Sequence, residues 1–173
     1  MIQKKDIRNR CKKIKIVLTD VDGVLTDGGR YYSEKGEVLK KFHVRDGMGV
    51  NILLRNNIKT IIITKENSKV VKCWAKAMNV SKVFSGIKAK EGKLETICKN
   101  YKVVPAEIAF IGDDVNDIEL MKKVGFSAAP SDGTTQAVKT ANFVCKTLGG
   151  GGVLREIGDM ILTEKFPHKT KWY

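Results

Sequence analysis

The apolar residues of this chain gather in short runs that are separated by segments with a helical spacing of apolar positions. Three strong runs, rich in β-branched residues, lie at residues 14–18, 58–64 and 108–111, and three weaker runs lie at residues 82–84, 125–128 and 143–145. Uninterrupted apolar runs of this length are typical of strands that are buried on both faces. The pattern therefore predicts six strands inside one sheet.

Helical spacing follows most of these runs. The segments that show it are residues 47–56, 68–78, 90–101, 117–124, 134–141 and 153–162. Strands and helices that alternate along a chain indicate an α/β fold with a doubly wound, mostly parallel, Rossmann-like sheet. In such a sheet, ligands bind beyond the carboxyl ends of the strands, where the strand order reverses.

Residues 26–44 depart from this alternation. Two short extended segments, residues 31–33 and 38–40, flank the sequence Glu-Lys-Gly-Glu, which predicts a β-hairpin. We interpret this hairpin as a small flap and not as a large cap. With 173 residues the chain is long enough to bury one compact core, so we expect residues 1–173 to form a single domain.

The two ends of the chain differ in composition from the predicted core. Residues 1–13 form a basic leader, which we interpret as solvated. Residues 149–173 begin with four consecutive glycines and continue into the last predicted helix and a tail. Glycines allow either a mobile spacer or a close approach between two backbones.

Positive charge dominates the composition, with 32 Lys and Arg against 19 Asp and Glu. Such an excess suits nucleic acid, an anionic membrane surface or a small anionic substrate. The lysines are spread along predicted helix faces without interleaved aromatic residues, which argues against nucleic-acid binding. No apolar stretch is long enough to span a bilayer, and the four scattered cysteines form no metal-binding pair. We therefore expect a cytoplasmic protein with reduced thiols and no membrane partner.

Candidate chemistry begins with Asp-Val-Asp-Gly at residues 20–23, directly after the first predicted strand. In an extended segment, side chains two residues apart lie on the same side, so Asp20 and Asp22 can face one reacting centre. One carboxylate can attack phosphorus, while the other donates a proton to the leaving alkoxide and later accepts one from water. The alternative interpretation is a strand that simply ends in an acidic turn.

The second strong run ends at Thr64. Its hydroxyl, together with the backbone amides that open the next helix, can bind phosphate oxygens, or it can cap that helix. The third strong run ends in Gly-Asp-Asp-Val-Asn-Asp at residues 112–117, a set of oxygen ligands that suits Mg²⁺. A metal there would offset the repulsion between a carboxylate nucleophile and an anionic phosphate.

Phosphoryl transfer also needs a fixed cation near the transferred group. Lys88, Lys90 and Lys93 all lie just before or within the helix that precedes the 112–117 loop. Their positions alone do not distinguish between them.

Taken together, these motifs resemble the four motifs of the haloacid dehalogenase-like phosphatases, and the resemblance extends from about residue 14 to residue 162. It implies that Asp20 is the nucleophile and Asp22 the general acid/base. It further implies that Thr64 binds the phosphate and that Lys90 is the lysine of the family's motifs, the fixed cation near the transferred group.

The same resemblance implies a Mg²⁺ site. Its ligands would be Asp20, the backbone carbonyl of Asp22, and Asp113. Asp114 and Asp117 would lie just outside this set of ligands.

A closer resemblance is to the capless branch that includes 3-deoxy-D-manno-octulosonate 8-phosphate phosphatase and a domain appended to some sialic-acid cytidylyltransferases. It rests on the hairpin and on the sequences at residues 22–28, 44–49 and 149–156. In that branch the hairpins associate into a tetramer, and a neighbour's residues, with the Gly-rich tail, help to close the active site. The resemblance thus implies a homotetramer.

The chain departs from the octulosonate phosphatases directly after Thr64. Those enzymes usually carry Gly-Arg there, whereas this chain has Lys65 and Glu66, and the glutamate is similar to relatives that act on nine-carbon acids. A carboxylate accepts hydrogen bonds from sugar hydroxyls, so Glu66 is a candidate hydroxyl ligand. Lys65, Arg45 and Arg155 are candidates to meet the substrate's negative charge, although any of these side chains can instead be solvated.

Our hypothesis from the sequence is a Mg²⁺-dependent phosphomonoesterase that forms an aspartyl phosphate. The substrate would be the phosphate of a 2-keto-3-deoxy sugar acid, most simply 3-deoxy-D-manno-octulosonate 8-phosphate. An alternative substrate is the nine-carbon 2-keto-3-deoxynononate or N-acetylneuraminate 9-phosphate. Alternatives of other classes are a non-catalytic tetramerisation module of the cytidylyltransferase type and a nucleic-acid-binding protein.

Overall fold

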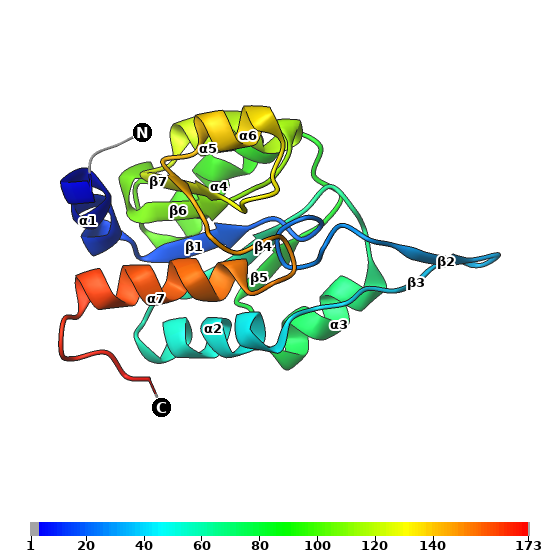
Figure 1. Ribbon diagram of the computed structural model, residues 1–173, viewed down its shortest axis with the longest axis horizontal. Helices are drawn as coiled ribbons and strands as arrows, with labels where there is room; N and C mark the ends of the chain where they lie inside the picture. Colours follow the sequence, from blue (N-terminus) through cyan, green and yellow to red (C-terminus); the bar gives the residue numbers. More distant parts are fainter. Residues whose placement is uncertain (1–3, 173) are drawn as a thin grey trace.

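The computed structural model describes residues 4–172. Its main sheet has the strand order β5-β4-β1-β6-β7-β8, and neighbouring strands in it pair in parallel (Figure 1). The strands are β1 (Ile16–Thr19), β4 (Lys59–Ile63), β5 (Lys82–Phe84), β6 (Ile108–Ile111), β7 (Phe126–Ala129) and β8 (Phe143–Val144). The predicted doubly wound parallel sheet is therefore confirmed, with strand ends that shift by one or two residues.

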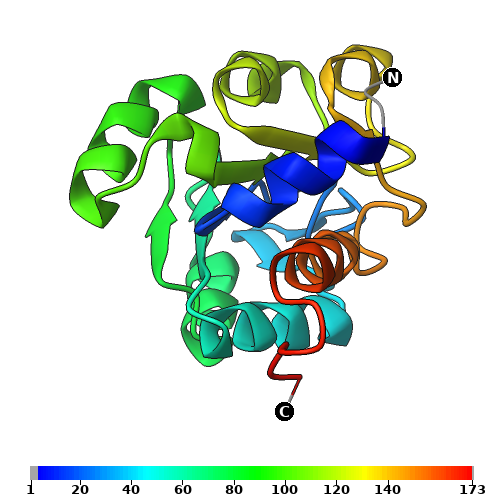
Figure 2. The same ribbon diagram turned by 90° about the vertical axis from the view of Figure 1, so that its left-hand side faces the viewer.

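Helices cover both faces of this sheet (Figures 1 and 2). They are α1 (Lys4–Lys13), α2 (Val44–Arg55), α3 (Lys69–Ala77), α4 (Leu94–Tyr101), α5 (Ile118–Lys123), α6 (Thr135–Thr140) and α7 (Val153–Lys165). Short 3-10 helices, η1 (Lys90–Lys93), η2 (Pro105–Glu107) and η3 (Val115–Asp117), precede α4, β6 and α5. The apolar residues of α1, α2, α3 and α7 enter one core cluster, and those of α4, α5 and α6 enter another.

The apolar runs form strands because both sides of the sheet are covered. In β1, Val17 belongs to one core cluster while its neighbours Ile16 and Leu18 belong to the other. Each such side chain contributes about 1.5–3 kcal/mol when it is fully buried. With both faces covered, the ends of the strands are left as the place for a binding site.

The strand order reverses at β1. After β1 the chain adds β4 and then β5 on one side, and later β6, β7 and β8 on the other. Loops that leave the carboxyl ends of β1, β4 and β6 consequently meet at one switch point, where doubly wound sheets bind ligands.

The predicted hairpin is present as β2 (Tyr31–Ser33) and β3 (Gly36–Leu39), which pair antiparallel. It extends away from the body of the molecule (Figure 1). Tyr31, Tyr32, Val38 and Leu39 are each more than half exposed on it, at 57%, 63%, 53% and 52%.

The basic leader is solvated on only one side, so that interpretation of the sequence holds only in part for residues 4–13. These residues form α1, which packs against α7. Cys11 is completely buried, Ile7 packs against the same core, and Arg10 donates a hydrogen bond to the carbonyl of Gly125 at 2.6 Å. The basic composition concealed one apolar helix face, while Lys5 and Lys12 remain exposed. Residues 1–3 lie outside the described residues.

The four glycines at residues 149–152 approach the loop after β1 closely. The backbone nitrogen of Gly150 donates to the carbonyl of Val24 at 3.0 Å. A Cβ atom at Gly149 would lie 2.2 Å from the carbonyl oxygen of Gly23. Of the two interpretations of this run, close backbone approach is therefore the one that holds.

Within residues 4–172, no helix combines the length and the apolar character that crossing a membrane requires. The four cysteines are all unpaired thiols, and Cys11 and Cys145 are buried.

We expect the substitution Gly150→Ala to destabilise the fold. Gly150 has a φ angle of +67°, and an added Cβ would lie 2.4 Å from the backbone nitrogen of Asp27. The left-handed backbone alone should lower the free energy of unfolding by about 1–3 kcal/mol, which chemical denaturation measures. Gly92→Ala is the matched control, because a Cβ there meets no other described atom within 4 Å. Equal stability of the two variants would contradict this account.

Candidate active site

A pocket of about 300 Å³ lies at the switch point of the sheet. It brings together predicted residues from the loops after β1, β4 and β6. Its lining consists of Asp20, Asp22, Gly23, Gly28, Arg30, Thr64, Lys65, Glu66, Asp113, Asp114, Val115 and Asn116.

Asp20 lies at the floor of this pocket, immediately after β1. It is only 5% exposed. Its Oδ1 accepts a hydrogen bond from the backbone nitrogen of Val21 at 2.7 Å, and its Oδ2 lies 2.6 Å from the Nζ of Lys90. Burial raises the pKa of Asp20 to about 6, although the charge of Lys90 acts in the opposite direction. The side chain is thus fixed in position and pointed at the pocket.

Lys90 is completely buried at the start of η1. Its ammonium lies between the carboxylates of Asp20, at 2.6 Å, and Asp117, at 2.5 Å. Burial by itself disfavours the charge, but these two carboxylates raise the pKa of Lys90 above its ordinary value. Lys88 is exposed and Lys93 is half-buried. The structure therefore identifies Lys90 as the lysine that contacts Asp20, a choice that sequence position alone did not allow.

Asp117 holds the acidic loop in place. It is fully buried, and its Oδ1 accepts from Lys90. Its Oδ2 accepts hydrogen bonds from the backbone nitrogens of Asp113 and Asp114 at 3.0 and 3.3 Å. Gly112 permits this packing, because a Cβ there would lie 2.6 Å from the Asp117 side chain. Both carboxylate oxygens of Asp117 are therefore engaged.

Asp113 shows the clearest need for a cation. Its Oδ1 is buried and has no hydrogen-bond partner among the described residues. Burial, followed by the negative charges of Asp20 and Asp117, raises the pKa of Asp113 to about 8. Gly23, with a φ angle of +83°, lets the two loops meet, because a Cβ there would lie 2.0 Å from Asp113 Oδ2.

A divalent cation fits these residues. Asp20, Asp113 and Asp117 each offer a carboxylate oxygen, and these oxygens lie within 4.8 Å of one another. Asp20 and Asp113 line the pocket, whereas Asp117 lies outside the lining and has both of its oxygens engaged. Asp20 and Asp113 are therefore the better direct ligands. Crowded, desolvated carboxylates favour a hard cation such as Mg²⁺. Asp114 is exposed and instead accepts a hydrogen bond from the backbone nitrogen of Val115 at 2.7 Å.

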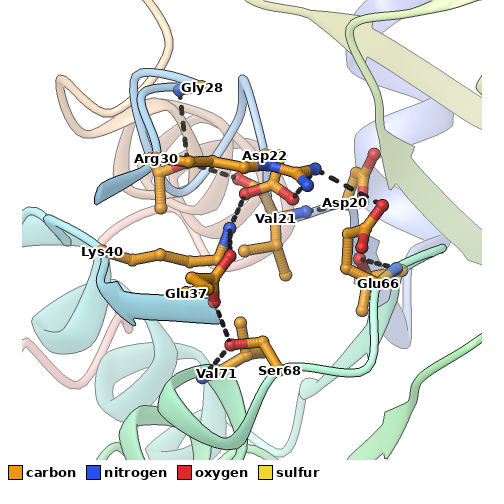
Figure 3. Close-up of polar contacts among 12 residues, drawn as sticks. Asp20, Val21, Asp22, Gly28, Arg30, Glu37, Lys40, Glu66, Ser68 and Val71 are labelled. Carbon is orange, nitrogen blue, oxygen red and sulfur yellow. Dashed lines mark hydrogen bonds and ion pairs between the residues drawn. The ribbon is translucent and has the colours of Figure 1, made fainter. Parts of the chain in front are cut away.

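Asp22 borders the same pocket, but its carboxylate is held by two cations of the hairpin region (Figure 3). Its Oδ2 lies 3.0 Å from Nη2 of Arg30, and its Oδ1 pairs with Nζ of Lys40. The side chain of Lys40 is completely buried and also lies 3.0 Å from Glu37. Sequence reasoning missed Arg30 and Lys40. The only signal for them is that the hairpin replaces a cap and follows the aspartates directly.

The loop after β4 contributes Thr64, Lys65 and Glu66. Thr64 is buried, and its hydroxyl accepts a hydrogen bond from the backbone nitrogen of Glu66 at 3.3 Å. The helix cap is Ser68, whose hydroxyl accepts from Val71 N at 3.4 Å. Thr64 is therefore not the cap of α3, which leaves its hydroxyl beside the pocket.

Arg45 and Arg155 do not line this pocket, contrary to what the sequence led us to expect. They line a second one with Gly152 and Asp159. Arg155 pairs with Asp159 at 2.7 Å, and its backbone nitrogen donates to Asp46 Oδ1 at 2.9 Å. The cause is local, since both arginines follow the packing of α2 against α7 and not the strand ends.

Comparison with known proteins agrees with this geometry. A family model described as haloacid dehalogenase-like hydrolase matches residues 55–157. The 3-deoxy-D-manno-octulosonate 8-phosphate phosphatase of Escherichia coli strain K12 is 33% identical over 157 residues, which are 91% of this chain and 84% of that protein.

Solved structures are similar over nearly the whole chain. The 3-deoxy-D-manno-octulosonate 8-phosphate phosphatase of Yersinia pestis superposes with a TM-score of 0.90 and 33% identity, covering 92% of this chain and 86% of that one. The phosphatase of the same name from Moraxella catarrhalis, solved with a magnesium ion, a phosphate ion and a KDO molecule, gives a TM-score of 0.90 and 31% identity, with 94% of both chains covered. This chain therefore belongs to the haloacid dehalogenase-like hydrolase family, and it is a phosphatase.

Proposed function

We propose that the chain is a Mg²⁺-dependent phosphomonoesterase that acts on the phosphate of a 2-keto-3-deoxy sugar acid, most simply 3-deoxy-D-manno-octulosonate 8-phosphate. One observation carries the proposal. At the switch point, Asp20 lies against the buried ammonium of Lys90 and near the carboxylate of Asp113, one oxygen of which has no partner within residues 4–172. The names of the relatives and the ligands of the Moraxella catarrhalis structure support the substrate class.

Asp20 and Asp113 would hold the metal, together with the backbone carbonyl of Asp22. Mg²⁺ bound there supplies charge that reduces the repulsion between an anionic nucleophile and an anionic phosphate. Asp117 would act through its contacts with Lys90 and with the backbone of the acidic loop.

In the proposed reaction an Asp20 carboxylate oxygen attacks phosphorus in line, and the phosphorus–oxygen bond to the sugar breaks. Asp22 donates a proton to the departing oxygen. Water then attacks the aspartyl phosphate while Asp22 accepts its proton, which releases orthophosphate and restores Asp20. Lys90 neutralises the transferring group, and the Thr64 hydroxyl binds one of its oxygens.

Lys65 and Glu66 would contact the sugar part of the substrate. Both line the pocket, and Glu66 is half-buried, a setting in which its carboxylate can accept hydrogen bonds from sugar hydroxyls. Because the glutamate at position 66 resembles that of relatives acting on nine-carbon acids, 2-keto-3-deoxynononate and N-acetylneuraminate 9-phosphate remain the alternative substrates. Arg45 and Arg155 have no proposed role in the pocket of their own subunit.

We further propose a homotetramer in which a neighbouring subunit completes the active site. The support is the hairpin, whose Tyr31, Tyr32, Val38 and Leu39 expose apolar surface on a slender projection (Figure 1). Grouped apolar side chains of this kind mark interaction surfaces. A second copy of the hairpin would cover them.

The remaining charge and thiol chemistry fits the same proposal. A net charge of +13 would attract an anionic small molecule, so no nucleic-acid partner is invoked. The four unpaired thiols suit the reducing cytoplasm.

We expect Asp20→Asn to lower kcat by at least about 1,000-fold, because the amide cannot serve as the nucleophile. Released orthophosphate, measured with Mg²⁺ and again with a chelator, reports the loss, and the chelator should also abolish wild-type turnover. Asp6→Asn, on α1 and paired with Arg10, is the control that should keep full activity. Undiminished Mg²⁺-dependent activity in the Asp20→Asn variant would exclude the mechanism.

Substrate length is tested by comparing kcat/KM for the eight-carbon and nine-carbon acid phosphates. We expect the eight-carbon ester to be preferred. Glu66→Ala should reduce kcat/KM on the preferred ester about tenfold, the effect of one lost hydrogen bond to a charged group. If the nine-carbon ester proves to be the better substrate, the alternative assignment replaces the first.

The double substitution Tyr31→Ser with Leu39→Ser should dissociate the tetramer, because these residues are directly paired across the hairpin and both are exposed. Light scattering coupled to size exclusion would show a smaller mass. Val104→Ser is the control, since Val104 is 55% exposed and precedes β6, at the opposite end of the parallel strands from the loop that leads into the hairpin. A wild-type protein that is monomeric at micromolar concentration would disprove the assembly.

A further inference from the structure

Arg30 occupies the mouth of the active pocket and has no role in the mechanism above. We propose that Arg30 binds the carboxylate of the sugar-acid substrate and that, in doing so, it gives up one oxygen of Asp22, so that it determines specificity for acidic substrates. This inference rests on the proposed function and adds the residue that recognises the acid.

The geometry shows a side chain shared between two walls of the pocket. Nη2 of Arg30 lies 3.0 Å from Asp22 Oδ2 and 3.4 Å from Glu66 Oε1. Figure 3 shows the guanidinium between these two carboxylates. The Arg30 side chain keeps 31% of its surface exposed, so an incoming anion can reach it.

The balance of charge in the pocket favours such an exchange. Five lining residues carry carboxylates, namely Asp20, Asp22, Glu66, Asp113 and Asp114, whereas Arg30 and Lys65 are the basic residues of the lining. A substrate with a phosphate at one end and a carboxylate at the other needs a cation at each end. Lys90 serves the phosphate end, because it is buried against Asp20.

Of the two basic lining residues, Arg30 is the better match for a carboxylate. A guanidinium presents a planar fork that pairs with both carboxylate oxygens, whereas an ammonium is a flexible point charge. Arg30 is already positioned by Asp22 and Glu66, while Lys65 is exposed and forms no ion pair within residues 4–172. Because Glu66 can still hold the guanidinium after Asp22 is released, less conformational freedom is lost when Arg30 binds the substrate.

The second hairpin cation explains why this exchange would not displace Asp22. Nζ of Lys40 pairs with Asp22 Oδ1 and with Glu37, and Glu37 accepts a hydrogen bond from Ser68 at 2.6 Å. The Lys40 side chain is completely buried, so this pair stays in place. When Arg30 turns to the substrate, only Asp22 Oδ2 is released, and that oxygen becomes available to the leaving group. A sugar phosphate whose sugar carries no carboxylate cannot bring about this release.

The test compares kcat/KM for 3-deoxy-D-manno-octulosonate 8-phosphate with kcat/KM for D-arabinose 5-phosphate, an ester whose sugar carries no carboxylate. The ratio of the two values cancels any effect on steps that both esters share. In Arg30→Gln we expect this ratio to fall about 10- to 100-fold, the effect of losing a charge-assisted bond. Arg30→Lys keeps the positive charge but lacks the planar guanidinium, so its ratio should lie between those of the wild type and Arg30→Gln.

Two further variants make the result specific. Lys65→Gln removes the other basic side chain of the lining and should lower the ratio less than Arg30→Gln does, because Lys65 is exposed. Arg8 pairs with Glu164 and does not line the pocket. The control variant Arg8→Gln should therefore leave the hydrolysis of both esters unchanged.

The inference is overturned if Arg30→Gln keeps the wild-type ratio, or if Lys65→Gln abolishes the preference and Arg30→Gln does not. Either result leaves the proposed function standing, because the acid ester is still hydrolysed. A wild-type protein that hydrolyses neither ester, or that shows no preference for the acid, would overturn this inference together with the proposed substrate.

Discussion

The buried ammonium of Lys90 is the interaction on which the rest of the site depends. It lies between Asp20, at the end of β1, and Asp117, in the loop after β6. An unpaired buried charge is very unfavourable, and removing one partner of such a pair typically costs about 3–5 kcal/mol. Three segments that are distant in sequence are thus held together by a single cation.

The group formed by Lys90, Asp20 and Asp117 also leaves a need for further positive charge in the pocket. One ammonium faces two carboxylates. The Asp113 carboxylate, one buried oxygen of which has no partner in the described part of the chain, lies close to both. The protein alone leaves an excess of negative charge beneath a site that accepts an anion. A divalent cation resolves the contradiction, because it satisfies the carboxylates and presents positive charge to the phosphate.

The hairpin connects the pocket to the surface of the molecule. Through Lys40 and Glu37 it reaches both Asp22 and Ser68, the residue that caps α3. Its outer residues are apolar and exposed. A partner that covers the hairpin would therefore restrain the same element that orients the Asp22 carboxylate.

Much of the fold and the floor of the site could be predicted from the sequence, because local patterns determine them. The β-branched runs give strands, and residues that end parallel strands converge, so Asp20, Thr64 and Asp113 were placed together correctly. Choosing Lys90 needed the family resemblance, since three lysines share similar positions. The helix α1 was missed because its basic composition outweighed the few apolar residues on one face.

Arg30 and Lys40 could not be predicted, for a different physical reason. Both belong to the hairpin region, whose angle to the sheet depends on tertiary contacts such as the hydrogen bond between Ser68 and Glu37. No spacing rule relates a hairpin side chain to the end of a strand. For Arg45 and Arg155 the sequence predicted a place in the pocket that the structure does not give them. Both lie near a family motif, but they belong to α2 and α7 and line a different pocket.

The pocket that results contains few uncommitted charges. Asp20 is paired with Lys90, and Asp22 with Lys40 and Arg30. Apart from a bound cation and Lys65, the pocket can therefore offer an anionic substrate a favourable charge contact only where an existing partner is replaced. Exchange at a partly exposed arginine costs less than exchange at a completely buried lysine, because the arginine remains partly hydrated throughout. Under the proposed mechanism, differences in burial among the paired cations would thus determine which contacts yield to substrate and which keep Asp20 and Asp22 in place.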